Sequence, residues 1–361
     1  MNVPALPSYD IRQTYDWNYR RPPSLVEWME GSGKVPERRE MPGSWTFAGL
    51  PVASPLGIAA GPLLNGAWCR YYAQLGFDVL TYKTVRSRQW ECYPLPNLTP
   101  VDCGQLAGDE PGVSASTESA SSWAVSFGMP SQSPSIWQED VQATKESFRE
   151  LGRKPQPLLS VSVVATVAPG AVEADLVDDY AKCARLAIAA GADCVEANFS
   201  CPNVSTCDGD LYLQPALAGR VAAALRAATG DVPLLVKVGH FRDDRLEDAA
   251  ELLRQLAPQA TAVVTTNSVA SRVRGANGEW MFSGQRRGIC GAATREASLR
   301  QVEFFRRWVD RAGAALRIIG VGGISTAAHV RSYLDAGAEA VQLATAAMQQ
   351  PDIGLRIRDQ W

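Results

Sequence analysis

Residues 316–345, LRIIGVGGISTAAHVRSYLDAGAEAVQLAT, contain one complete strand–helix–strand unit. Apart from Arg317 and Gln342, no polar residue occurs at 316–321 or 340–343, as in parallel strands that are buried on both faces. Residues 325–335 lie between them and have the composition of a helix, and parallel neighbouring strands need such a crossover. This stretch therefore predicts a βαβ unit.

The same alternation extends along the chain from about residue 51. Helix-like stretches at 173–190, 217–229 and 297–312 each end at a glycine, which accepts the left-handed conformation just past a last turn. Eight strand-like runs are present, at 56–60, 78–83, 158–164, 193–198, 234–238, 262–266, 316–321 and 340–343. Eight such units close an α/β (β/α)8 TIM barrel. A doubly wound open sheet is the alternative architecture.

Two segments depart from this alternation. Residues 1–45 are polar with scattered aromatic residues, and we expect an N-terminal arm packed on a barrel domain at 46–361. Residues 90–135 form a long insertion between the second strand and its helix, where barrel loops face the catalytic end. The Ser-, Gly- and acid-rich part at 108–122 has the composition of a mobile loop.

Composition and charge exclude several classes of protein. The chain has 35 basic and 38 acidic residues with no basic block, which argues against a nucleic-acid partner. No apolar run approaches the ~18 residues of a membrane helix, and the first residues lack a secretory signal, so we expect a soluble, cytoplasmic protein. With two histidines and eight cysteines without a CxxC pair, no metal site and no Ser–His–Asp triad is expected.

Polar, lysine and glycine residues follow the predicted strands at their carboxyl ends. The Gly322-Gly323 pair opens a tight turn before a helix, where backbone N–H groups can face a phosphate, and Ala344-Thr345 follows the neighbouring strand. A plain turn is the alternative for the glycine pair. No GxGxxG follows an early strand, so a nicotinamide dinucleotide is not supported.

Lys83 and Lys237 lie at strand ends deep in the predicted barrel, where a lysine is costly unless it meets an anion. Either lysine could turn outward or pair with a carboxylate such as Glu196. The functional interpretation places both against the electron-rich end of a redox cofactor.

Three segments carry a family resemblance: Asn198-Phe199-Ser200-Cys201-Pro202-Asn203, Val236-Lys237-Val238 and Gly320-Val321-Gly322-Gly323-Ile324. In this order they resemble the dihydroorotate dehydrogenase family, which includes the flavin domain of dihydropyrimidine dehydrogenase. The resemblance implies an FMN at the mouth of the barrel domain. Its phosphate would meet Gly291, Gly322, Gly323, Ala344 and Thr345, its ring or ribityl chain Ala60, Gly61, Thr84 and Asn198, and its pyrimidine end Lys237.

The same resemblance implies a mechanism. Cys201 matches the base of the family's soluble class and would take a proton from one carbon while a hydride leaves the next carbon for flavin N5. Lys83 would sit where flavin and substrate meet. The residues that match substrate contacts are Asn198, Asn203, Asn267 and Ser268.

One position departs from the family pattern. Val125 precedes Ser126-Phe127-Gly128-Met129-Pro130 where the family has Asn, and losing one polar partner costs roughly 1–3 kcal/mol for the usual ligand. We expect an enzyme of pyrimidine metabolism that interconverts a dihydroorotate-like dihydropyrimidine and its unsaturated form. The alternatives are a specialised member that acts on another cyclic amide or enone, and a non-catalytic flavin-binding barrel. The expected partner is a small-molecule substrate, and a homodimer is left open.

Overall fold

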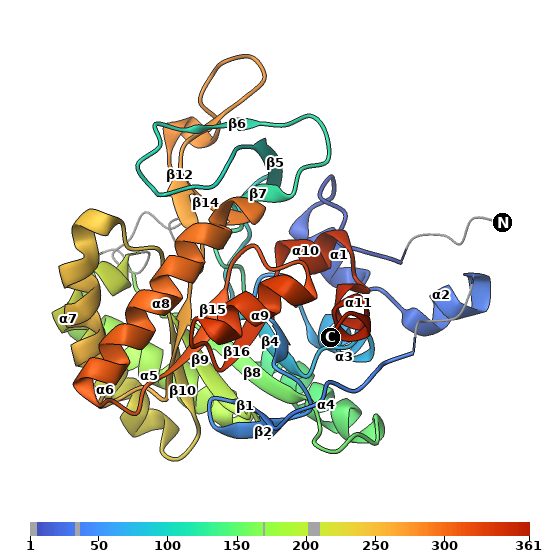
Figure 1. Ribbon diagram of the computed structural model, residues 1–361, viewed down its shortest axis with the longest axis horizontal. Coiled ribbons are helices and arrows are strands. Elements are labelled where there is room, and N and C mark those ends of the chain that lie inside the picture. Colours follow the sequence, from blue (N-terminus) through green and yellow to red (C-terminus); the bar gives the residue numbers. More distant parts are fainter. Residues whose placement is uncertain (1–5, 33–36, 169, 201–209) are drawn as a thin grey trace.

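Eight parallel strands close into a barrel in the computed structural model, which describes residues 6–32, 37–168, 170–200 and 210–361 (Figure 1). Around the barrel they follow in chain order: β3 (Leu56–Ile58), β4 (Val79–Val85), β8 (Leu158–Val163), β9 (Cys194–Asn198), β10 (Leu234–Lys237), β11 (Ala262–Thr265), β15 (Arg317–Val321) and β16 (Ala340–Leu343). The predicted TIM barrel is confirmed, and the open doubly wound sheet is wrong because β16 pairs with β3.

Helices between the strands cover the outside of the barrel. They are α3 (Gly66–Gln74), α4 (Pro134–Glu150), α5 (Glu173–Ala189), α6 (Pro215–Thr229), α7 (Leu246–Leu256), α8 (Arg295–Ala312) and α9 (Ala327–Asp335). After β16 the chain forms two short helices, α10 (Thr345–Gln349) and α11 (Ile353–Asp359). Helix α8 ends as the sequence predicts, with Gly313 in the left-handed conformation at φ +60°.

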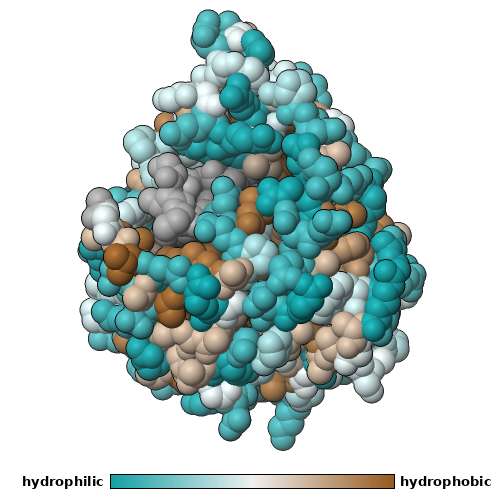
Figure 2. All heavy atoms as spheres, turned by 90° about the vertical axis from the view of Figure 1, so that its left-hand side faces the viewer, coloured by the Kyte–Doolittle hydropathy of each residue, from teal (hydrophilic) through white to brown (hydrophobic). Residues whose placement is uncertain are grey.

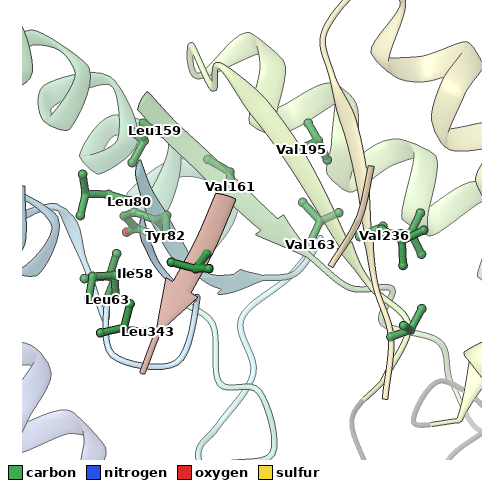
Figure 3. Close-up of a cluster of buried hydrophobic side chains, with 14 of the residues drawn as sticks. Ile58, Leu63, Leu80, Tyr82, Leu159, Val161, Val163, Val195, Val236 and Leu343 are labelled. Carbon is green, nitrogen blue, oxygen red and sulfur yellow. The ribbon is translucent and has the colours of Figure 1, made fainter. Parts of the chain in front are cut away.

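Alternate residues of the barrel strands pack in opposite directions. In β11, Val263 belongs to the large core between strands and helices, whereas Ala262 and Val264 belong to a second cluster inside the barrel. Figure 3 shows part of the large core, with Ile58, Leu80, Leu159 and Val161 among its labelled side chains. The hairpin of β1 (Trp45–Phe47) and β2 (Leu50–Val52) contributes Phe47 and Val52 to the inner cluster.

A six-stranded sheet stands over the barrel, at the top of Figure 1. Its strands β5 (Leu98–Asp102), β6 (Val113–Ala115) and β7 (Ser122–Val125) come from the predicted insertion. The others, β12 (Val269–Ser271), β13 (Val273–Arg274) and β14 (Arg287–Gly291), come from an excursion after β11 that the sequence did not predict. The mobile loop expected at 108–122 is wrong in part, because β6 lies within it and pairs with β5 and β13.

The N-terminal segment packs against α3. It contains α1 (Tyr15–Arg20) and α2 (Leu25–Ser32). The Tyr71 hydroxyl donates to the Pro7 carbonyl at 2.6 Å, and the Asn65 side chain donates to the Tyr19 carbonyl at 2.9 Å. These bonds hold the segment on the barrel, while the domain boundary at residue 45 stays a prediction.

The face of the molecule that carries α7 is mostly polar. Figure 2 shows the face that carries α7, where hydrophobic residues are scattered among hydrophilic ones and the projecting end of the six-stranded sheet is hydrophilic. None of the helices in the described part of the chain is both long and apolar enough to cross a membrane.

Candidate active site

A cavity opens between the carboxyl ends of the barrel strands and the six-stranded sheet. It is lined by most of the residues predicted for the site: Ala60, Gly61, Lys83, Thr84, Asn198, Lys237, Asn267, Gly291, Gly322, Gly323, Ala344 and Thr345. Ser268 is buried next to Asn267 and does not line the cavity. Cys201 and Asn203 lie outside the described residues. The structure thus brings together residues from the ends of seven barrel strands, as parallel strands in a barrel require, and Gly291 from β14 of the six-stranded sheet.

The two predicted lysines are both buried in this cavity. Lys83 on β4 is 7% exposed, and its Nζ lies 4.6 Å from the ring centroid of Phe127. Lys237 ends β10 and is 5% exposed. Both side chains therefore end in a cavity that is largely shielded from water. An anionic ligand there would offset the cost of burying the positive charges.

Glu196 lies on β9, next to the strand that carries Lys237, and is fully buried. Neither carboxyl oxygen has a hydrogen-bond partner within the described chain, and no ion pair joins Glu196 to Lys237 there. The alternative in which these two residues form an ion pair is therefore wrong. Burial raises the pKa of Glu196, an effect that the positive charge of Lys237 opposes.

Two asparagine side chains at the mouth are held by hydrogen bonds. The Oδ1 of Asn198 accepts from the Ser200 N–H at 3.1 Å, and its Nδ2 donates to Met129 Sδ at 3.6 Å. The Nδ2 of Asn267 donates to the Ser200 carbonyl, and its backbone N–H donates to the Val238 carbonyl at 3.0 Å. These hydrogen bonds fix the positions of the Asn198 and Asn267 side-chain amides, which line the cavity.

The glycine turn after β15 lines the cavity with Gly322 and Gly323. Gly322 and Gly323 have φ of +135° and +63°, values that residues with a Cβ rarely adopt. A Cβ on Gly323 would lie 2.6 Å from Arg295 Cβ, and one on Gly322 would lie 2.9 Å from Ser298 Cβ. Within the described chain, the N–H groups of both glycines donate no hydrogen bond. Both N–H groups can therefore donate to an anion, and a phosphate at this turn stays a prediction.

The sequence predicted that the 90–135 insertion faces the site and singled out Val125 and residues 126–130, but it did not predict the other residues that cover the cavity. The covering residues are Leu98, Ser121, Trp123, Val125, Phe127, Met129 and Cys290, from β5, β7, β14 and the segments beside β7. The unusual length of the 90–135 insertion was the signal that this region shapes the site. Which of its side chains face inward depends on the pairing of β7 with β14, whose residues lie far away in the sequence.

In the parts of the chain that the structure describes, no group of three or more His, Cys, Asp or Glu side chains is placed to hold a metal ion. The cavity is instead lined by lysines, amides and backbone groups, which suit an organic anion.

Comparison with known proteins identifies the family. The sequence model described as "Dihydroorotate dehydrogenase" matches residues 44–360. The chain belongs to the dihydroorotate dehydrogenase family. The dihydroorotate dehydrogenase of Dictyostelium discoideum is 30% identical over 97% of this chain and 96% of that protein. The dihydroorotate dehydrogenase (quinone) of Pseudarthrobacter chlorophenolicus is 28% identical over 88% of this chain and 84% of that protein.

A solved structure of the same family supports the fold. The crystal structure of DHODH from Eimeria tenella in complex with ferulenol has a TM-score of 0.71 and covers 96% of this chain and 90% of that one. Its identity is 17%, so it shows the barrel and not the chemistry of the site. Membership of the dihydroorotate dehydrogenase family makes this chain an oxidoreductase, and the non-catalytic alternative is not supported.

Proposed function

We propose that this enzyme binds FMN and interconverts a dihydroorotate-like dihydropyrimidine and its unsaturated form. One observation carries the proposal: two buried lysines, two fixed amides and a glycine turn with available N–H groups line a single cavity. Membership of a family of flavoenzymes agrees with it. Small-molecule substrates of this kind need buried polar groups at defined positions, which this cavity supplies.

The residues present fit an FMN. Its phosphate would be held by the N–H groups of Gly322 and Gly323 before α9, where a helix start also favours negative charge. Lys237 would face the pyrimidine end of the flavin, because a buried ammonium stabilises negative charge on a reduced ring. Further contacts would come from Ala60, Gly61, Thr84, Asn198, Gly291, Ala344 and Thr345. When bound, FMN supplies the two-electron acceptor for the reaction.

The other polar residues would bind and deprotonate the substrate. Asn198 and Asn267 each offer a donor and an acceptor, which suits a ring with alternating C=O and N–H groups. Lys83 would hold its ammonium beside the reacting ring. The resemblance assigns further substrate contacts to Asn203 and Ser268. It also assigns to Cys201 the removal of a proton from one ring carbon, while the neighbouring carbon loses a hydride.

The test is an anaerobic titration of the purified protein. The released cofactor is identified by chromatography, and dihydroorotate and 5,6-dihydrouracil are added while the flavin absorbance is followed. We expect FMN and bleaching by at least one of these rings, with a rate at least ~100-fold lower in Lys83→Ala at unchanged flavin content. Protein without FMN, or FMN that no cyclic amide reduces, would overturn the proposal.

Three sequence-based expectations also stay predictions: a cytoplasmic location, a homodimer, and the division into an arm at 1–45 and a barrel at 46–361. Sedimentation of the purified protein measures the second of these directly.

A further inference from the structure

A layer of polar side chains crosses the inside of the barrel below its mouth. Barrel interiors are usually filled by bulky apolar residues, and the residues two positions before Thr81, Glu196 and Gln342 do belong to the inner hydrophobic cluster. Side chains two residues apart on a strand point to the same face, so these three polar side chains also point into the barrel. With two serines of β8 they form what we call the polar layer: Thr81, Ser160, Ser162, Glu196 and Gln342, all fully buried.

Several oxygen atoms of the polar layer lack a hydrogen-bond partner within the described chain. They are the Ser160 hydroxyl, both carboxyl oxygens of Glu196 and the side-chain oxygen Oε1 of Gln342. The other end of the Gln342 amide is fixed, because its Nε2 donates to Thr81 Oγ1 at 2.8 Å. If Glu196 were ionised, three of these oxygens could only accept, and the Ser160 hydroxyl could serve at most one of them. Each buried acceptor left without a donor costs about 1–3 kcal/mol.

A proton on Glu196 improves this balance. The protonated carboxyl group has one O–H donor and no charge. Ser162 lies opposite Glu196 in the sheet register, and the Ser162 and Gln342 side chains are close enough to the carboxyl group to lower its pKa. Burial raises the pKa of Glu196 and outweighs both of them. Gln342 Oε1 is thus an acceptor without a partner beside a group that can carry a donor.

The charge of Glu196 matters to Lys237. Lys237 lies on β10, two residues beyond the residue opposite Glu196, and it forms no ion pair within the described chain. The other titratable side chains around Glu196 are the Lys83 ammonium on β4 and the Cys194 thiol, two residues earlier on β9. A carboxylate below Lys237 would oppose its positive charge, whereas a neutral acid leaves that charge to a ligand in the cavity.

We propose that Glu196 is a positioning residue that stays protonated at neutral pH, donates a hydrogen bond to Gln342 Oε1, and leaves the Lys237 ammonium to an anionic ligand. Gln342 lines the cavity, so this hydrogen bond also fixes a group at the floor of the site. That the ligand is the cofactor rests on the proposed function, but the protonation of Glu196 does not. An apolar site can keep a carboxylic acid neutral at pH 7 so that it serves as a donor.

Infrared spectroscopy tests the protonation directly. At neutral pH, the spectrum of wild type minus that of Glu196→Gln should contain the C=O band of a protonated carboxyl group. Glu339→Gln is the matched control, because Glu339 forms an ion pair with Arg317 at 2.9 Å and its removal should delete a carboxylate band instead. A carboxylate band in the Glu196→Gln difference spectrum would overturn the proposal.

A second variant tests the acceptor and serves if Glu196→Gln does not fold. Gln342→Leu removes the oxygen that is proposed to accept from Glu196. The band of the protonated carboxyl group should therefore move to higher frequency, as it does when a carboxylic acid loses its hydrogen-bond acceptor. An unchanged band would show that Gln342 is not the acceptor.

The reduction potential of bound FMN tests the effect on Lys237. At neutral pH, Glu196→Gln should change the ratio of reduced to oxidised flavin at a fixed potential by less than about twofold, since one neutral group replaces another. Lys237→Gln, measured with FMN in excess, should lower this ratio at least about tenfold. As the pH rises and Glu196 ionises, the ratio in wild type should fall below that in Glu196→Gln. A ratio that is already higher in Glu196→Gln at neutral pH would mean that a carboxylate opposes Lys237 in wild type, and would overturn the proposal.

The infrared measurement does not need the cofactor, so the two proposals fail separately. Protein that binds no FMN but shows the band of protonated Glu196 would overturn the proposed function alone. An FMN enzyme that reacts with a dihydropyrimidine but lacks this band would overturn the inference about Glu196 alone.

Discussion

The Lys83 ammonium lies over the Phe127 ring, 4.6 Å from its centroid, inside the cavity. Two aromatic residues of the N-terminal segment pack against the same ring, with centroid distances of 6.0 Å for Tyr9 and 6.1 Å for Tyr15. The N-terminal segment thus fixes the position of the Phe127 ring, and the face of this ring contacts the Lys83 ammonium. A cation over an aromatic face in a desolvated site gains about 2 kcal/mol.

Phe127→Leu should therefore slow flavin reduction by the substrate about tenfold, because the ammonium loses the ring that stabilises it. Phe127→Tyr keeps an aromatic face and should retain most of the rate. Phe282→Leu is the matched control, since Phe282 lies 4.9 Å from the Arg287 guanidinium and does not line the cavity. Equal rates of flavin reduction in the Phe127→Leu variant and wild type would show that the contact between Lys83 and the ring does not contribute to the reaction.

Cys201→Ser should keep the flavin but slow its reduction about 10²–10⁴-fold at neutral pH, because a hydroxyl is far harder to deprotonate than a thiol. Raising the pH should recover part of the rate. Stopped-flow reduction under anaerobic conditions measures both effects. Cys103→Ser, which alters a half-buried thiol away from the cavity, should leave the rate unchanged. A wild-type rate in the Cys201 variant would place the base elsewhere.

Gly323→Asp should yield colourless protein. The new side chain would start 2.6 Å from Arg295 Cβ and put a carboxylate where the phosphate is proposed to bind. Gly313→Asp is the control, because Gly313 also has a positive φ but nothing within 4 Å of its Cβ position and lies outside the cavity. The flavin content of each variant is measured as absorbance at the flavin band per mole of protein. A fully yellow Gly323→Asp variant would refute the phosphate site.

Arg358→Met should lower the free energy of unfolding by about 3–5 kcal/mol, because it leaves the carboxylate of Asp78 buried without one of its partners. Arg358 on α11 is fully buried, pairs with Asp78, and donates to the carbonyls of Gly76 at 2.7 Å and Arg39 at 3.0 Å. Urea unfolding measures the loss.

The control for that experiment is on the same helix. Arg356 forms an ion pair with Asp352 but its side chain is 59% exposed, so Arg356→Met should cost at most about 1 kcal/mol. Similar losses in the two variants would mean that the buried pair contributes no more than a surface pair.

The free energy of unfolding of the Glu196→Gln variant should increase relative to that of wild type as the pH rises. Burial raises the pKa of Glu196, so the folded chain holds this proton more tightly than the unfolded chain does. The contribution of Glu196 to wild-type stability is therefore fully present below the pKa of this group in the unfolded chain. It is lost as the pH rises through the higher pKa of the folded chain. Unfolding free energies of both proteins between about pH 5 and about pH 8 measure the difference, and parallel pH curves would contradict it.

Local sequence predicted the barrel and its polar mouth well. Runs such as 78–83 and 193–198 match β4 and β9 closely, because parallel strands covered on both faces need continuous apolar residues. Lys83, Asn198 and the Gly322-Gly323 pair lie at or just after the carboxyl ends of barrel strands. They line one cavity because the carboxyl ends of all the parallel strands meet on one side.

The tertiary structure alone decided what covers that mouth. Trp123 lies opposite Cys290 and Val125 opposite Gly288, and each pair joins segments that are far apart in the sequence. Short strands with few apolar residues carry little local signal, so their pairing is set by packing against the barrel and each other. The contact between Lys83 and Phe127 depends on that packing as well. The sequence therefore determined which polar groups gather at the mouth, and the fold determined which residues of the six-stranded sheet cover them.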